Sequence, residues 1–348
     1  MTIQLTKVQL FLILFIMQTG FVYTSFQNLV IEHSHRDATV QFIIIAIVFF
    51  LQMLFFERMH QYFVLNQVTK TLYLIYWTIY LIIFVNYISY VLTTWVFLNT
   101  PSIVLISIFL LVCFYASISR PETAINIGAI LLPMLVFFIL FMLLTIPDLH
   151  FTNLLPLFHD RDKKWMLGFV YSSYAFGGAE MYVMLRKYLP KSEKVNKKIL
   201  SIYFGILFSF YLFSITFTLM FFALDEIALI PEPIFYILHS LEVSFVKRLD
   251  LFFIYIWLSW SLIAIINYVL VMRLIYFEKK RKAPRLKQFI FFAFVGATSI
   301  FLTRYSVLEF FKHYAVYASI VFTFFIPIII ILVNKMRGRM VSESDTSS

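Results

Sequence analysis

The sequence predicts an all-α integral membrane protein with about ten transmembrane helices. Hydrophobic residues make up 62% of the chain and charged residues only 13%, whereas about 25% of the residues in soluble domains are charged. Apolar runs of about 20 residues, the length that crosses a bilayer, recur along the whole chain. A soluble fold could not bury this much apolar surface, so we expect one membrane domain without an added globular part.

The apolar runs define the expected spans in chain order. The first run could be a signal peptide, but it lacks a small-residue cleavage site and further spans follow it at once. We therefore expect it to remain as the first helix of a single transmembrane domain, residues 1–336, with a short cytoplasmic tail at 337–348. The expected spans are 8–28, 38–56, 71–97, 101–118, 124–146, 166–185, 199–224, 250–275, 288–304 and 313–333.

The charge pattern predicts that both termini are cytoplasmic. With these spans, 20 of the 28 Lys and Arg residues fall on the side that holds both chain ends, and cytoplasmic connections are enriched in these residues. The densest groups lie at 186–198 and 279–287. The net charge of +10 is therefore explained by membrane topology rather than by nucleic-acid binding.

The connections on the opposite side offer few sites. His33 and His35 lie beside acidic residues, including Asp37, where solvated loop residues are favoured over a metal site. Cys113 has no partner and is expected to face lipid or fill the core. The connection at 225–250 either caps the bundle as a short amphipathic helix or binds a partner. Its apolar residues at helical spacing are Ile234, Ile237, Leu238, Leu241 and Phe245.

Two spans carry polar, glycine-containing interruptions. The first is Met17-Gln18-Thr19-Gly20-Phe21, and the second runs from Tyr174 to Glu180 through Phe176, Gly177 and Gly178. They occupy corresponding positions in two halves of five spans, about 8–146 and 166–333, which is typical of inverted-repeat transporters with broken first and sixth helices. They predict a small-ligand site near the bilayer midplane. Close helix packing at the glycines is the alternative.

Glu180 is the only acidic residue expected well inside a span. A carboxylate in the membrane is costly unless it is paired, protonated or hydrated. Glu180 could therefore accept a substrate ammonium group, relay a proton or hold the helix break in place. A structural hydrogen bond, or a position near the surface next to Arg186 and Lys187, is the alternative.

Other polar and aromatic residues complete the expected site. Asn86 and Asn267 are intramembrane amides with serines at helical spacings, and each fits an interhelical hydrogen bond better than a ligand contact. Trp257 and Trp260 could form a pocket wall together with Phe176. The candidate ligand-binding residues are Gln18, Thr19, Gly20, Phe21, Asn86, Tyr174, Phe176, Gly177, Gly178, Glu180, Trp257 and Ser261.

Catalytic and metal-binding motifs give no support to an enzyme. The sequence contains no HExxH motif, Walker A motif, nucleophile elbow or Cys/His cluster. We therefore predict no catalytic residues and no metal ligands.

Several segments resemble one family of membrane proteins. Ser119-Arg120-Pro121-Glu122, the run from Ile127 to Pro133, Ile146-Pro147-Asp148 and the run from Asn153 to Pro156 resemble the spore germination B-subunit (GerAB-type) permeases. The segments Phe176 to Glu180 and Arg248-Leu249-Asp250 are similar as well. The likeness extends over the length of the chain.

The resemblance implies a fold and a role. It implies membership of the amino acid/polyamine/organocation superfamily, with a LeuT-like 5+5 inverted repeat. The helix breaks then fall on Gln18 to Phe21 and Tyr174 to Glu180, and faces of the third and eighth helices complete the pocket. Superfamily members that bind an amino acid carboxylate often have a glycine-rich first break. Here Gly20 stands alone in that break, which argues against an ordinary α-carboxylate site.

The function implied by the resemblance is nutrient sensing in the inner membrane of a dormant spore. The germinant is usually an amino acid or another small nutrient, and the partners are a membrane-embedded A subunit and a C-subunit lipoprotein. The resemblance implies neither enzymatic activity nor an obligatory cofactor, and nucleic acid is not an expected partner.

Two other functions stay open at the level of sequence. A proton-coupled amino acid transporter would use Glu180 as its proton carrier. A passive water or ion pathway would need a continuous polar lining, and the sequence has too few intramembrane polar positions to trace one.

Overall fold

The computed structural model describes residues 4–119, 121–158, 164–190, 192–227, 229–241, 248–276, 285–303 and 305–338. Within these ranges the regular structure is helical throughout, and no strand is present. Six helices are long and apolar enough to cross a membrane. They are Phe26–Tyr62, Gln67–Trp95, Ile125–Leu143, Lys197–Phe221, Leu249–Tyr276 and His313–Met336.

Six is fewer than the expected number of spans because the remaining apolar runs fold into short or interrupted helices. The helices α5 (Ser102–Ile118) and α14 (Arg285–Phe301) contain 17 residues each. The helix α1 (Lys7–Gly20) contains 14 residues, and the sixth apolar run is divided between α8 (Leu167–Ser173) and α9 (Glu180–Leu185). Length and composition therefore establish a multi-pass helical protein with six candidate spans among the described residues.

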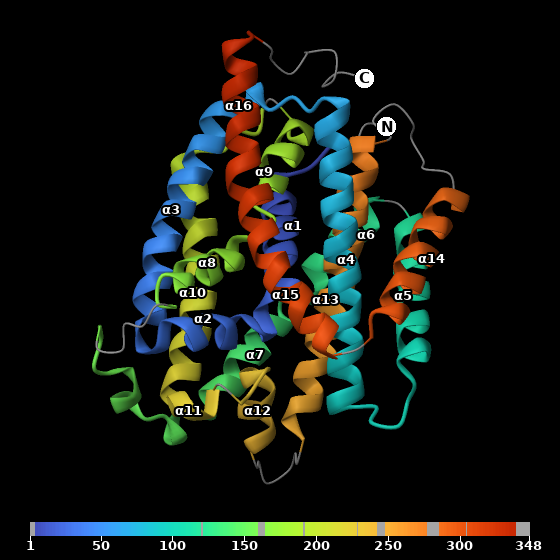
Figure 1. Cartoon of the computed structure of the whole chain (residues 1–348). Helices are drawn as coiled ribbons and strands as arrows, with labels where there is room; N and C mark the ends of the chain where they lie inside the picture. The colour runs from blue at the N-terminus through green and yellow to red at the C-terminus, as the bar shows by residue number, and fades with distance from the viewer. Residues whose placement is uncertain are drawn as a thin grey trace.

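The first apolar run ends its helix earlier than expected. Thr6 caps α1 by accepting a hydrogen bond from the Gln9 amide, and α1 ends at Gly20. A short 3-10 turn, η1 (Val22–Thr24), leads into α2 (Phe26–Ser34). Figure 1 shows α2 running across the molecule, at a steep angle to the upright helices. The expected span at 8–28 therefore consists of α1, a turn and the start of α2.

Long helices follow α1 and α2 in the chain. The helix α3 (Ala38–Met59) follows α2 through η2 (His35–Asp37), where His35 has a positive φ of 52°. Asn66 and Asn196 cap the next two long helices by accepting hydrogen bonds from backbone amides. These helices are α4 (Gln67–Trp95) and α10 (Lys197–Phe221), and α13 (Leu249–Tyr276) packs directly against α1.

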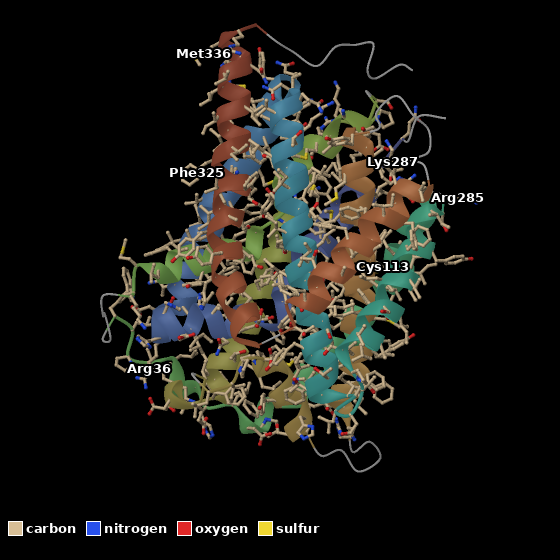
Figure 2. The ribbon with its side chains drawn as sticks, turned by 45° about the vertical axis from the view of Figure 1, so that its right-hand side comes forward. Arg36, Cys113, Arg285, Lys287, Phe325 and Met336 are labelled. Carbon is tan, nitrogen blue, oxygen red and sulfur yellow. The ribbon has the colours of Figure 1, made fainter. Side chains whose placement is uncertain are left out.

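Two further apolar runs have irregular middles. The run after Pro121 forms α6 (Pro121–Leu131) and α7 (Met134–Leu143), and Pro133 stands between them. The last run forms α15 (Tyr305–Ile320), a π-helical turn η8 (Val321–Phe325) and α16 (Ile326–Met336). Figure 2 shows Phe325 partway along this last run and Met336 at its end. Proline is the cause in both runs because it cannot donate a backbone hydrogen bond.

Short helices close the end of the bundle opposite Met336. They are η4 (Ile146–Asp148), η5 (Phe151–Leu154), α11 (Leu224–Ile227) and α12 (Pro233–Ser240). In α12 the side chains of Ile234, Ile237 and Leu238 are fully buried, and the helix packs against α13. Of the two alternatives for this connection, α12 fits the capping helix, because this chain covers its apolar face. Phe245 lies outside the described residues.

Two expectations about the first outer turn are wrong. Asp37, expected to be solvated, is 3% exposed and accepts hydrogen bonds of 2.7 Å from the Phe158 amide and the Trp165 indole. His33 is 6% exposed and bonds to the Leu29 carbonyl. Phe158 and Trp165 cover Asp37, and His33 packs on the ring of Tyr171 at 4.2 Å between centroids; the sequence pattern does not reveal these contacts. Cys113 is fully buried, so it fills the core.

The ends of several helices meet at one end of the molecule, which we call the basic end. Figure 1 shows the C-terminal ends of α3, α9 and α16 at this end. Arg186 pairs with Glu57 there, and the Asn334 amide bonds to the carbonyls of Tyr62 and Val64. Arg58, Lys187 and Lys335 are neighbours of these residues in the chain.

Candidate functional site

The C-terminal end of α1 is in close contact with α13. A Cβ atom at Gly20 would lie 2.6 Å from the Ala264 Cβ, so a side chain at this position would clash. The Ser261 hydroxyl donates to the Gly20 carbonyl at 2.9 Å, and the Trp260 indole donates to the Thr19 hydroxyl at 2.8 Å. Side chains of α13 thus satisfy polar groups that the end of a helix leaves unpaired.

Gln18 joins the two interrupted helices. Its side-chain amide donates to the Phe176 carbonyl at 3.2 Å, and its side-chain oxygen accepts a hydrogen bond from the Tyr203 hydroxyl. The Tyr211 hydroxyl donates to the Gln18 backbone carbonyl at 2.7 Å. Gln18 is 1% exposed. These contacts hold the end of α1 against the second interruption and against α10.

The second interruption is a turn built on glycine. After α8 the chain forms η6 (Tyr174–Phe176), and Gly178 adopts a φ of +93° before α9 begins at Glu180. Glycine adopts such a conformation without the steric penalty that a side chain brings. A Cβ atom at Gly177 would lie 2.8 Å from the Ser319 hydroxyl, so α15 also passes close to this turn.

Glu180 is fully buried at the start of α9. One carboxylate oxygen accepts a hydrogen bond of 3.1 Å from the Trp77 indole, and the other accepts one of 2.8 Å from the Thr323 hydroxyl. The Thr323 oxygen in turn accepts a hydrogen bond of 3.3 Å from the Gly178 amide. The carboxylate therefore ties the glycine turn to α4 and to the π-helical turn η8.

The π-helical turn has an identifiable origin. Pro327 has no backbone N–H, so the carbonyl of Thr323, four residues earlier, lacks its helical partner. The Gln52 amide fills this role by donating to the Thr323 carbonyl at 2.8 Å. The Tyr73 hydroxyl donates to the adjacent Phe322 carbonyl at 3.1 Å. Single π turns are frequent at functional sites, and this one carries the hydroxyl that binds Glu180.

Aromatic rings fill the space next to the interruptions. The ring of Phe21 lies 5.1 Å from Tyr80, 5.6 Å from Tyr87 and 6.2 Å from Tyr174, measured between centroids. Tyr80 in turn lies 5.3 Å from Tyr268 of α13. These rings connect the first interruption to the glycine turn through α4 and α13.

The polar groups of this centre include hydroxyls without partners. The hydroxyls of Tyr80, Tyr174 and Ser319 are buried and form no hydrogen bond. A buried polar group without a partner is costly and unusual. Tyr80 and Tyr174 lie near each other and Ser319 lies near Tyr76, but none of the three hydroxyls forms a hydrogen bond with its neighbour. The described residues contain no group of three or more His, Cys, Asp or Glu side chains that could hold a metal ion.

A half-buried ion pair holds α9 at its other end. Arg186, in η7 (Arg186–Tyr188), contacts both carboxylate oxygens of Glu57 at 2.9 and 3.1 Å, and the Tyr182 hydroxyl donates to Glu57 at 2.5 Å. Burial alone would lower the pKa of Arg186, but the hydrogen bonds and charge of Glu57 outweigh it and raise the pKa above its ordinary value.

Most of the sequence-predicted site residues come together. Thr19, Gly20 and Ser261 meet between α1 and α13, Gln18 bonds to the Phe176 carbonyl, and Phe21 lies beside Tyr174. Gly177, Gly178 and Glu180 form the glycine turn and its anchor.

The expected aromatic wall is not formed. Phe176 stacks on Phe49 of α3 at 4.3 Å between ring centroids. Trp257 packs on Phe235 of α12, and the Trp260 indole bonds to Thr19, so each of the three residues packs against a different partner. Asn86 donates to the Ile82 carbonyl of its own helix at 3.4 Å rather than to either interruption. Asn267 is buried and its side-chain amide forms no hydrogen bond.

Sequence reasoning missed the residues that hold Glu180 and Gln18. They are Trp77, Thr323, Tyr203 and Tyr211, and Gln52 was missed as the residue that bonds to the Thr323 carbonyl. Pro327 was a usable signal for Thr323, because a proline inside an apolar run frees the carbonyl four residues earlier. The tyrosines and Trp77 carried no comparable signal, since aromatic residues make up 20% of the chain.

Broken and kinked helices around a buried polar centre define a multi-pass α-helical membrane protein with a permease-like interior. The chain belongs to the spore permease family of spore germination proteins, whose family model matches residues 4–306. This confirms the resemblance seen in the sequence. The family is one of permeases and receptors rather than enzymes. Comparison with curated proteins gave no match.

Proposed function

We propose that this protein is the B subunit of a germinant receptor, which senses a small nutrient and triggers spore germination together with an A subunit and a C-subunit lipoprotein. Family membership supports the role in germination. The observation that carries the site is the meeting of two interrupted helices through the hydrogen bond from Gln18 to the Phe176 carbonyl. Such interruptions surround the ligand sites of permease folds.

A LeuT-like arrangement of ten spans accounts for the irregular helices. The interruptions after Gly20 and after Ser173 then belong to the first spans of two five-span halves. The proline-linked irregularities at Pro133 and at η8 belong to the last spans of the same halves. Two inverted repeats are expected to have helix irregularities at corresponding positions, as these two halves do.

The basic end supports a cytoplasmic location for both termini. The Leu5 amide donates to the Tyr188 carbonyl near Arg186, and α16 ends beside the turn that follows Arg58. Positive residues near both chain ends therefore gather at one end of the bundle, as the positive-inside rule requires of the cytoplasmic side. In a spore this orientation places the opposite end, with α12, on the outer face of the inner membrane.

Nutrient binding would act by shifting a conformational equilibrium. A ligand shifts the equilibrium between two conformations only to the extent that it binds one of them more tightly than the other. Glu180 and Thr323 connect the glycine turn to η8, so a ligand that contacts the turn would change the stability of the contact between α9 and η8. This change is the signal that partner subunits would receive.

Direct binding and uptake test the proposal together. A panel of nutrients is added to the purified protein, with and without the A and C subunits, and any bound compound is then tested for uptake in proteoliposomes. Binding without accumulation supports the sensor. Accumulation against a gradient by this protein alone would replace the sensor with a proton-coupled transporter, for which the buried Glu180 carboxylate is a suitable proton carrier.

A further inference from the structure

The balance of charge around Glu180 points to the chemistry of a ligand. Its carboxylate is fully buried and is bound by the neutral donors of Trp77 and Thr323. No Lys, Arg or His side chain in the described ranges forms an ion pair with it. A buried carboxylate without a cation is costly in a membrane protein. A positively charged ligand group would lower this cost.

Hydroxyl groups with free lone pairs lie in the same cluster. Ser319 is one helical turn before Thr323, and its hydroxyl lies 2.8 Å from the Cβ position of Gly177. The Tyr268 hydroxyl lies 3.4 Å from the Cβ position of Gly178. The glycine turn, two residues before Glu180, is thus lined by oxygen atoms from α13 and α15.

Tyr80 and Tyr174 extend this oxygen-rich lining. Tyr80 packs against Tyr268, and both Tyr80 and Tyr174 pack against Phe21. The hydroxyls of Tyr80, Tyr174 and Ser319 are buried and form no hydrogen bond. A hydroxyl oxygen can accept hydrogen bonds from an ammonium group, and tyrosine rings attract cations to their faces.

The same groups disfavour an anionic ligand. The lining consists of one carboxylate, neutral hydroxyls and aromatic rings, so a ligand carboxylate would meet a like charge without a basic side chain to offset it. A ligand whose positive end lies at the glycine turn would satisfy Glu180 and the unpartnered hydroxyls together.

We propose that Glu180 and the hydroxyls of Tyr80, Tyr174 and Ser319 form a subsite for a protonated organic amine. The inference rests on the proposed nutrient-sensing function and narrows its ligand class. The recognised compound carries a primary ammonium group and no carboxylate beside it, as in a decarboxylated amino acid or an amino acid amide.

Matched trios of compounds test the ligand class. Isothermal titration of the purified full-length protein uses alanine, ethylamine and propionate, and then valine, isobutylamine and isovalerate. Alaninamide and valinamide extend the series. We expect the amines and amides to bind, the amino acids to bind more weakly and the acids not to bind. Tighter binding of the amino acids or the acids than of the amines would overturn the subsite.

Glu180→Gln tests the charge itself. It should weaken amine binding roughly 10- to 100-fold, the effect of losing one hydrogen bond to a charged group. Glu226→Gln, at an exposed position in α11, is the matched control and should leave the affinity unchanged. Equal amine affinity in wild type and Glu180→Gln would contradict the proposal.

Tyr80→Phe and Tyr174→Phe separate binding from folding. Since neither hydroxyl has a partner, their removal should leave the melting temperature unchanged or higher. Amine affinity should fall about 2- to 10-fold, as for the loss of a neutral hydrogen bond. Tyr255→Phe, at a residue 62% exposed on α13, is the control. Unchanged affinity in both variants would remove the hydroxyls from the subsite.

The outcomes also separate this inference from the proposed function. If wild type binds a neutral or acidic nutrient and Glu180→Gln binds it equally well, nutrient sensing stands and the amine subsite fails. If NaCl or KCl binds at this site in a Glu180-dependent way and amines do not compete, the subsite holds an inorganic ion and the inference is wrong. If wild type binds no compound with or without its partners, both proposals fail.

Discussion

The two interrupted helices are stabilised in different ways. Between α1 and α2, neutral hydrogen bonds from Tyr211 and Ser261 satisfy freed carbonyls, and Gly20 lies in direct contact with α13. Between α8 and α9, a turn at Gly178 is held by a buried carboxylate that other helices bind. The first interruption is therefore fixed by packing, whereas the second depends on one charge. Disturbed packing should lower stability at the first interruption, and loss of the charge should lower the ligand response at the second.

The largest expected effect is the loss of ligand response in Glu180→Gln. The amide keeps the size of the carboxylate and can still accept hydrogen bonds, so the protein level in the membrane should stay normal. The nutrient concentration for half-maximal germination should rise more than about tenfold, because a hydrogen bond to a charged group is lost. Germination assays and immunoblots of spore membranes measure both quantities. A variant absent from the membrane would show instead that Glu180 is structural.

Gly20→Ala should lower stability rather than response. The new Cβ would lie 2.6 Å from the Ala264 Cβ, and overpacking of this kind costs about 1–3 kcal/mol. Thermal denaturation in detergent measures the loss as a lower melting temperature. The double variant Gly20→Ala with Ala264→Gly moves the methyl group from α13 to α1. This variant should recover much of the lost stability. No recovery would mean that α1 and α13 do not meet at these residues.

Arg186→Gln should destabilise the attachment of α9 to α3. The side chains of Arg186 and Glu57 are 12% and 18% exposed. Loss of their ion pair should therefore lower the free energy of unfolding by about 2 kcal/mol. Glu57→Gln should cost a similar amount, and the double variant should cost less than the sum, as coupled partners do. Strictly additive effects in a double-mutant cycle would show that the pair contributes little.

The smallest expected effect is that of Gly178→Ala. A side chain at a φ of +93° is strained, and the cost of a left-handed residue is about 1 kcal/mol. The Tyr268 hydroxyl at 3.4 Å leaves room for a methyl group. Gly205→Ala, with nothing within 4 Å, is the control and should be neutral or stabilising because it lies inside α10. If Gly205→Ala and Gly178→Ala lowered stability equally, the effect of Gly178→Ala would not be due to backbone strain.

The sequence predicted the class of fold because long apolar runs are visible without knowledge of tertiary structure. It also located both interruptions, since Gly20 and the Gly177–Gly178 pair stand out in a chain with 8 glycines. The direction of each side chain was not predictable. Phe176 lies on α3 rather than beside Trp257, because helix rotation is set by packing among many similar aromatic residues.

The buried environment of Asp37 and the partners of Glu180 were missed for a related reason. Asp37 lies in a polar stretch that is typical of a loop. Its hydrogen-bond partner Trp165 lies 128 residues further along the chain. Thr323 and Trp77 reach Glu180 from parts of the chain more than a hundred residues away. Contacts of this range leave no periodic signal in one sequence.

The proline in the last apolar run also has a mechanical consequence. Because Pro327 removes a backbone hydrogen bond where α16 begins, side-chain contacts of Gln52 and Glu180 with Thr323 help to set the angle between α15 and α16. The helix α16 has 11 residues, which makes a lever of about 16 Å. A swivel of about 10° at the Thr323 end would then move the Met336 end by about 3 Å. A change in bonding at one hydroxyl would thus become a displacement large enough for a neighbouring protein to detect.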